Sequence, residues 1–551
     1  MTFFYDTYRL KVGFLARYNF ILRGAIMENR LSLKQIKFGK TDAFNELKEF
    51  GADWFTRAFF SYERYELESF IEGSSYYICG EKGTGKTTML RYLQCKLSED
   101  PSTLIIPIRF KSDLDSEDKK SFVRAATNVK EITAEGWNEF KDDSDAVIVW
   151  QIYILNKFFS TYSHSGAYEF FEENREFDEI NKLLKVVYPE FEEKIVPKIK
   201  RGQLNLNTNN IKFLDAKLQL EIGVESPSST ISFNRIAKNI IHKFSTLHFK
   251  GNKAYIIFDE LELSIRSQKE HQRDIKLVRD LIIAIDRLNE ICKTNGFDIH
   301  IIGSIRTEVI KSVHSAGYEI NKSIEDYGVT ISWYQRGGNY EDNRLLKLIE
   351  NKIIACEEMC GITEHGDIWK KYFPDRINGV TTKKYILNYS WMHPRDIIRL
   401  MNGVLRQHND EMTFTQEMFD RAMKSYSSAS WGEIIEGLSL KYSADDIAII
   451  KRILTNIEVP FTFQFISTRL NELGTIDLKI EDFKRRHNLN DILDDLFDFG
   501  VVGNTGQRMI FKFMEDDDLA LTEDMMIHKP LRNFFGVKSR VKSNNSDIYA
   551  E

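Results

Sequence analysis

The fold is decided by residues 75–88, which read Ser75-Tyr-Tyr-Ile-Cys-Gly-Glu-Lys-Gly-Thr-Gly-Lys-Thr-Thr88. They fit the pattern G-x-x-x-x-G-K-[ST], in which a glycine-rich turn joins a strand to a helix and backbone N–H groups surround phosphate oxygens. Apolar residues on both sides of the turn predict a buried strand at 76–79 and a helix from Lys86. A chance glycine-rich turn is the alternative, but the strand–loop–helix context argues against it. The stretch therefore predicts binding of a nucleoside triphosphate.

The loop offers several kinds of contact to such a ligand. Lys86 is expected to reach the β- and γ-phosphates, and the hydroxyl of Thr87 to bind Mg²⁺. The helix that begins at Lys86 also directs the positive end of its dipole at the anion. The expected nucleotide contacts from the loop are Gly80, Gly83, Thr84, Gly85, Lys86, Thr87 and Thr88. ATP and Mg²⁺ are thus the predicted cofactors.

The composition of the 551-residue chain is ordinary for a protein of two to four domains. Lys and Arg number 76 against 82 Asp and Glu, so no global positive charge points to nucleic acid or to an anionic membrane. The longest apolar stretch, 146–155, is far shorter than the roughly 20 residues of a membrane span. The first 25 residues lack the apolar core of a signal peptide, and Met27 is a second candidate start of translation. We therefore expect a cytoplasmic protein without membrane contact.

The five cysteines give no metal-binding pattern. Cys356 and Cys360 form the only close pair, and no second Cys/His pair with metal-ligand spacing accompanies them. Reduced thiols are the prediction.

A second buried strand supplies carboxylates. It reads Ala254-Tyr-Ile-Ile-Phe-Asp-Glu260, an unbroken apolar run that ends in two acids. Ligands of open α/β sheets bind at the carboxyl ends of strands, so Asp259 is expected to hold the hydration shell of Mg²⁺ and Glu260 to orient or deprotonate water. An ordinary strand capped by acids is the alternative, and the upstream loop favours the catalytic interpretation.

A further strand at 297–307 ends in Ser304 and Arg306. A cation there would lie beside the γ-phosphate, and a surface arginine after a strand is the equal alternative.

In this order, the loop, Asp259-Glu260 and Ser304-Ile-Arg306 resemble the AAA+ and STAND branch of the P-loop ATPases. The resemblance implies a three-layer αβα core, with Ser304 and Arg306 at the family's sensor 1. The segment Trp391-Met-His-Pro-Arg-Asp-Ile-Ile-Arg-Leu-Met-Asn402 looks like the family's lid-helix sensor 2. It implies that Arg395 contacts the nucleotide and that Pro394 opens the lid helix.

Two more segments narrow the resemblance. Residues 38–46 and 324–333, together with the loop, are similar to a poorly characterised group of bacterial STAND-like ATPases. The resemblance covers roughly 38–538, and it implies a role in phage defence or stress signalling. The spacing between the two halves of the site departs from the pattern, because 142–229 looks like an extended insert.

The predicted organisation is α/β with a helical lid and a C-terminal winged-helix-like domain. The insert is expected to carry an antiparallel hairpin made of 203–207 and 217–222, and it is either a partner-binding or sensor element or a structural decoration. The predicted parts are an N-terminal extension at 1–37, a P-loop core at 38–335, a lid at 336–430, a winged-helix-like domain at 431–538 and a disordered tail at 539–551.

Three helices and a hairpin predict the winged helix. The helices are expected from Ser443 to Leu454, at 461–473 and at 491–499, and the hairpin at 501–513. Lys484-Arg-Arg-His487 is a basic cluster suited to DNA. The acids of the third helix would repel phosphates, which favours packing on the ATPase core or on a protein partner.

Three functions stay open at this point. The leading one is a regulatory ATPase in which Glu260, Lys86 and Arg306 serve catalysis and the nucleotide state changes conformation, with a protein partner or a second copy of the chain. The second is a DNA-binding loader or remodeller, and nucleic acid is the less favoured partner. The third is a nucleotide-stabilised scaffold with negligible turnover. A small-molecule kinase fits worst, because nothing marks an acceptor pocket.

Overall fold

The computed structural model describes residues 30–61, 66–126, 146–165, 168–188, 203–205, 214–224, 230–264, 268–316, 320–335, 339–406, 410–506, 509–514 and 519–539. The chain divides into two compact units. Unit 1 comprises 1–62, 83–85 and 332–551, and unit 2 comprises 63–82 and 86–331. The candidate start at Met27 and the tail from residue 540 lie outside the described residues.

Unit 2 is built on a parallel five-stranded sheet with the order β2-β5-β6-β1-β7. Its strands are β1 (Tyr77–Gly80), β2 (Thr103–Arg109), β5 (Lys253–Leu261), β6 (Ile299–Arg306) and β7 (Gly328–Thr330). The edge position of β2 agrees with Pro107, which cannot donate to a strand on a second side. Because the strands are parallel, their carboxyl ends meet at one edge, where the predicted site residues fall.

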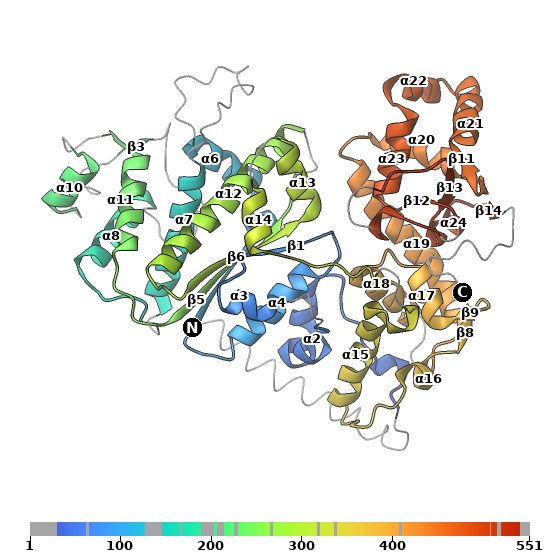
Figure 1. Ribbon diagram of the computed structural model, residues 1–551, viewed down its shortest axis with the longest axis horizontal. Coiled ribbons are helices and arrows are strands. Elements are labelled where there is room, and N and C mark those ends of the chain that lie inside the picture. Colours follow the sequence, from blue (N-terminus) through green and yellow to red (C-terminus); the bar gives the residue numbers. More distant parts are fainter. Residues whose placement is uncertain are drawn as a thin grey trace. The chain divides into compact units, whose positions relative to one another are not determined.

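Helices cover both faces of this sheet. Figure 1 shows α7 (Ala146–Ser165), α12 (Gln268–Thr294) and α13 (Thr307–Ser315) on one side and α3 (Leu67–Ile71) with α4 (Lys86–Leu97) on the other. The apolar stretch expected as core lies in α7, where the buried indole of Trp150 donates to the carbonyl of Leu277 at 3.0 Å. The arrangement is a three-layer αβα core. Unit 2 also contains α5 (Phe110–Asp113), α6 (Ser116–Ala126), α8 (Arg175–Val187), β3 (Gln203–Asn205), α10 (Ala216–Ile222), β4 (Thr230–Ser232), α11 (Phe233–Ser245) and α14 (Asn321–Tyr327).

The predicted hairpin of the insert is wrong in its second strand. Residues 217–222 belong to helix α10, and β3 pairs antiparallel with β4 instead. The alternation of Leu218, Leu220 and Ile222 also fits a helix, since Leu218 and Ile222 are buried one turn apart while Leu220 is 75% exposed. The side chain of Asp215 accepts the N–H of Leu218 at 2.9 Å and caps the helix. Residues 206–213 and 225–229 lie outside the described part.

The middle of unit 1 is helical. It contains η1 (Leu33–Gln35), α2 (Ala43–Ala58), η3 (Tyr340–Asp342), α15 (Arg344–Met359), α16 (Ile368–Tyr372), β8 (Arg376–Ile377), β9 (Val380–Thr381), α17 (Thr382–Asn388), α18 (Pro394–Leu405) and α19 (Gln416–Leu438). Helix α18 begins at Pro394 as expected, because proline tolerates the first helical position. Helix α2 packs on α15, where the buried ammonium of Lys352 lies 3.0 Å from the carboxylate of Glu46.

The C-terminal part of unit 1 has four helices rather than three. They are α20 (Ala444–Leu454), α21 (Phe463–Ile476), α22 (Leu478–Arg486) and α23 (Leu489–Asp498). A three-stranded antiparallel sheet has the order β11-β13-β12. Its strands are β11 (Phe461–Thr462), β12 (Val502–Asn504) and β13 (Asp524–Ile527), and the remaining elements are β10 (Glu458–Val459), η4 (Lys512–Met514), α24 (Lys529–Phe534) and β14 (Lys538–Ser539).

Two local predictions for this part need correction. The predicted hairpin at 501–513 is reduced to one antiparallel bridge, between Asn504 and Ile510, and the main partner of β12 is the more distant β13. Gly474 does not end α21, which continues to Ile476, because a glycine inside a helix costs only about 1 kcal/mol.

The same part packs on helices of its own unit. The indole of Trp391, just before α18, donates to the carbonyl of Phe499 at 3.3 Å, and the ring of Trp431 in α19 meets that of Phe535 edge-on at 5.1 Å. None of the described helices combines the length and the hydrophobicity that a membrane span requires.

Candidate nucleotide-binding site

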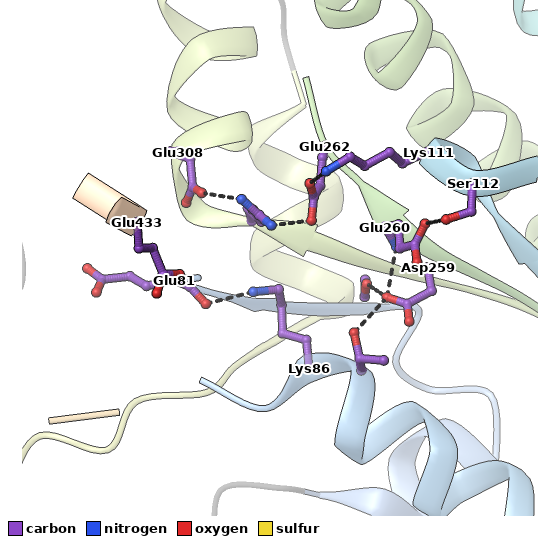
Figure 2. Close-up of polar contacts among 12 residues, drawn as sticks. Glu81, Lys86, Lys111, Ser112, Asp259, Glu260, Glu262, Glu308 and Glu433 are labelled. Carbon is purple, nitrogen blue, oxygen red and sulfur yellow. Dashed lines mark hydrogen bonds and ion pairs between the residues drawn. The ribbon is translucent and has the colours of Figure 1, made fainter. Parts of the chain in front are cut away.

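The glycine-rich loop connects β1 to α4, as the sequence predicts. Gly83 and Gly85 adopt φ values of 92° and 98°, which L side chains rarely reach. The ammonium of Lys86 donates to two carbonyls of its own loop, those of Gly80 at 2.8 Å and Glu81 at 2.7 Å (Figure 2). Lys86 is thereby held, with its side chain buried, at the carboxyl end of β1. Thr88 lies in the first turn of α4.

Asp259, at the end of β5, is the centre of a hydrogen-bond cluster. Its Oδ1 atom accepts the hydroxyl of Thr87 at 3.3 Å, the hydroxyl of Ser304 at 2.5 Å and the backbone N–H of Glu260 at 2.8 Å. These donors come from α4, from β6 and from the end of β5. Only one carboxylate oxygen is used by them, and Asp259 is 5% exposed.

Glu260 has an unusual backbone. Its φ is 57°, and the pairing of β5 with β6 shifts register between Phe258 and Leu261. Such an irregularity turns a side chain away from the regular alternation of a strand. The carboxylate of Glu260 accepts the hydroxyl of Ser112, in α5, at 2.5 Å (Figure 2). The side chain is therefore oriented by a polar partner from the neighbouring edge of the sheet.

Arg306, at the end of β6, is paired with acids. Its guanidinium contacts the carboxylate of Glu262 and lies 3.5 Å from that of Glu308. Glu262 also pairs with Lys111 at 2.8 Å (Figure 2). Burial raises the pKa of Glu262, but the charges of Arg306 and Lys111 outweigh it and leave that pKa below its ordinary value. The carboxylate is thus held ionised between two cations.

Arg395 is described within unit 1 alone. Its guanidinium lies 3.1 Å from the carboxylate of Glu433 in α19, which also pairs with Arg399. Its backbone N–H donates to the carbonyl of Gly83 at 3.3 Å, and the indole of Trp333 donates to the carbonyl of Thr84 at 2.8 Å.

Lys86, Thr87, Asp259, Glu260, Ser304 and Arg306 all lie at the carboxyl ends of β1, β5 and β6 in unit 2. Sequence reasoning missed Ser112, Lys111 and Glu262. Glu262 follows the Asp259-Glu260 pair by two residues, and that spacing was its only local signal. Ser112 and Lys111 come from a polar stretch taken as a loop, and nothing in that stretch predicts their partners.

The donors at this edge suit Mg²⁺. The ion keeps several water ligands and binds phosphates, so it needs only one or two protein oxygens. Thr87 and Asp259 provide a hydroxyl and a carboxylate in contact with each other. Within the described ranges no group of three His, Cys, Asp or Glu side chains forms a metal cage.

Comparison with known proteins gives two family matches. Residues 44–271 match the model of the ORC-CDC6-like family, and residues 343–434 match that of the FunZ-associated C-terminal helical domain. The search of curated proteins gives no match. The first match spans the glycine-rich loop and Asp259-Glu260, and the second spans α15 to α18 and most of α19. The chain therefore carries an AAA+ or P-loop ATPase-like nucleotide-binding domain.

Proposed function

We propose that this protein is a regulatory switch ATPase of the STAND/AAA+ type, which binds and hydrolyses Mg·ATP and couples the nucleotide state to conformation or to binding of a partner. The observation that carries the proposal is the contact of Thr87 with Asp259. It joins the glycine-rich loop to the acidic strand end, the two halves that a magnesium-dependent site needs. A role in bacterial defence or stress signalling is part of the same proposal and rests on the resemblance alone.

Each residue has a proposed task. Lys86 neutralises phosphate charge, while Thr87 and Asp259 hold Mg²⁺, which withdraws charge from the phosphate oxygens when bound. Glu260 takes the proton of the attacking water, and its contact with Ser112 fixes the direction of its carboxylate. Arg306 and Arg395 are the candidates for sensing the γ-phosphate.

The coupling to conformation is supported by the contacts of α18. Arg395 lies in its first turn and touches Gly83 through the backbone, while Trp391, four residues earlier, touches Phe499 of the C-terminal part. A change in loop geometry thus has a direct covalent path to the helices and sheet at 444–539. The molecular size and shape in ADP and in a non-hydrolysable ATP analogue test this. The wild type is expected to differ between the two ligands and Lys86→Ala to show no difference. Identical profiles for the wild type, with binding of both ligands verified, would contradict the switch.

DNA binding is the second candidate, because helices α20, α21 and α23 and the sheet β11-β13-β12 follow one another in the order of a winged helix. Two residues of its basic cluster are engaged by acids of the same domain. Arg486 lies 2.7 Å from Asp446, and Lys484 lies 2.9 Å from Glu481. These pairs favour a protein-packing role.

Binding to a DNA duplex at several salt concentrations separates the two. Salt-dependent binding that disappears when Lys484, Arg485 and Arg486 are replaced by Ala, with ATP turnover stimulated by DNA, would favour the loader. Absence of both is the result we expect.

A further inference from the structure

The tip of the glycine-rich loop is held by two donors from other parts of unit 1. The indole N–H of Trp333 donates to the carbonyl of Thr84 at 2.8 Å, and the backbone N–H of Arg395 donates to that of Gly83 at 3.3 Å. Trp333 follows β7 by three residues and is 2% exposed, and Thr84 is equally buried. A buried hydrogen bond of this length constrains the peptide that carries the carbonyl.

The direction of these carbonyls fixes the direction of two amides. In a planar trans peptide the C=O and N–H bonds point to opposite sides. The carbonyl of Gly83 shares its peptide with the N–H of Thr84, and the carbonyl of Thr84 shares its peptide with the N–H of Gly85. A donor that holds each carbonyl on one side therefore turns the next N–H to the other side. Successive amides turned the same way form the kind of concave surface that binds phosphate oxygens.

The close fit at the tip supports the same conclusion. A Cβ atom on Gly83 would lie 3.3 Å from the Cβ of Arg395 and 3.7 Å from that of His393. The side chain of His393 makes no cap to α18, so the carbonyl of Gly83 supplies an acceptor to the first turn of that helix. The ring of Trp333 is itself fixed beside Phe60, with ring centres 6.2 Å apart.

We propose that Trp333 is a positioning residue for phosphate recognition, whose indole N–H holds the Thr84 carbonyl so that the Gly85 amide is presented to a phosphate of the nucleotide. The proposal rests on the proposed binding of a nucleoside triphosphate. It assigns Trp333 no contact with the ligand. Its effect is therefore on affinity for phosphate-bearing ligands rather than on the chemical step.

The test is the affinity for Mg·ADP of Trp333→Phe, which keeps a ring and removes the donor. The matched control is Trp54→Phe, since Trp54 is equally buried in unit 1 and donates its indole N–H to the sulfur of Cys356 at 3.5 Å. We expect roughly tenfold weaker binding by Trp333→Phe and unchanged binding by the control. Pyrophosphate, as a competitor that carries phosphates alone, is expected to lose affinity in parallel.

Melting temperatures separate positioning from a general loss of stability. A positioning residue lowers the rise in melting temperature caused by Mg·ADP, whereas a purely structural one lowers the temperature equally with and without ligand. Trp333→Phe binding within twofold of the wild type, or an equal loss with both variants, would overturn the proposal. A wild type that binds no nucleotide would instead refute the proposed function.

A second measurement covers the case in which Trp333→Phe does not fold. The chain has seven tryptophans, and their indole N–H resonances can be followed in the wild type during a titration with Mg·ADP. We expect one of them, assigned to Trp333 by the folded variant Trp333→His or by selective labelling, to shift. If the Trp333 resonance stays in place while ADP binds, the proposal fails.

Discussion

The hydroxyl of Ser304 donates to Oδ1 of Asp259 at 2.5 Å, which joins the ends of two neighbouring strands. Oδ1 is thereby turned toward β6 and Thr87. Ser304→Ala should leave Asp259 less well oriented for Mg²⁺. We expect the Mg²⁺ concentration for half-maximal ATP turnover to rise roughly tenfold, since a hydrogen bond to a charged group is lost.

The control for this prediction is Ser312→Ala, because Ser312 is a serine of α13 whose hydroxyl donates to the carbonyl of Glu308. A titration of turnover with Mg²⁺ measures both variants. Equal Mg²⁺ requirements in Ser304→Ala and the wild type would argue against a metal-orienting role for Ser304.

Arg306 is predicted to discriminate ATP from ADP, because only ATP carries the γ-phosphate. Arg306→Ala should lower the affinity for ATP by roughly tenfold and leave that for ADP nearly unchanged. Glu262→Gln should act in the opposite direction, since Glu262 pairs with the same guanidinium. Glu308→Gln is the matched control, because its carboxylate lies 3.5 Å away at an exposed position. Equal losses for both nucleotides in Arg306→Ala would leave it as an arginine of the surface only.

His528 is predicted to make the stability of unit 1 depend on pH. It is fully buried, with the rings of Trp391 and Phe511 at 4.5 and 4.6 Å. Burial, reinforced by the charges of Arg532 and Lys529, holds the pKa of His528 well below its ordinary value. Below the ordinary pKa of about 6.5, the unfolded chain binds a proton that the folded chain does not, so stability falls as the pH falls.

The size of this effect follows from the linkage. At pH 5.5 the wild type should have lost about 1.4 kcal/mol relative to pH 7.5 through this group, and His528→Leu should lack that part of the loss. Urea unfolding of both proteins at the two pH values measures it. The same pH dependence in the wild type and the variant would show that His528 does not titrate on unfolding.

The nucleotide site was predictable because its signals are local. The loop at 80–88 and the apolar runs before Asp259 and Arg306 each specify an element and its end. Parallel pairing then brings these ends to one edge without further information. The edge position of β2 was equally legible from Pro107.

The remaining contacts were not predictable, because they join residues distant in sequence. The indole of Trp333 reaches a carbonyl 249 residues away, and the hydroxyl of Ser112 reaches a carboxylate 148 residues away. Helix α10 was mistaken for a strand since three alternating apolar residues fit either period when the segment is short. Its cap by Asp215 and the glycine at 223 were the signals that could have decided it.

The most direct test of the central claim is ATP hydrolysis by Glu260→Gln. Glutamine keeps the shape of the side chain and an oxygen for the hydroxyl of Ser112, but it cannot take a proton. Glu99→Gln, an exposed acid paired with Lys96, is the control. We predict that Glu260→Gln binds Mg·ATP within about twofold of the wild type and hydrolyses it roughly a hundredfold more slowly. Unchanged hydrolysis in Glu260→Gln would contradict the account.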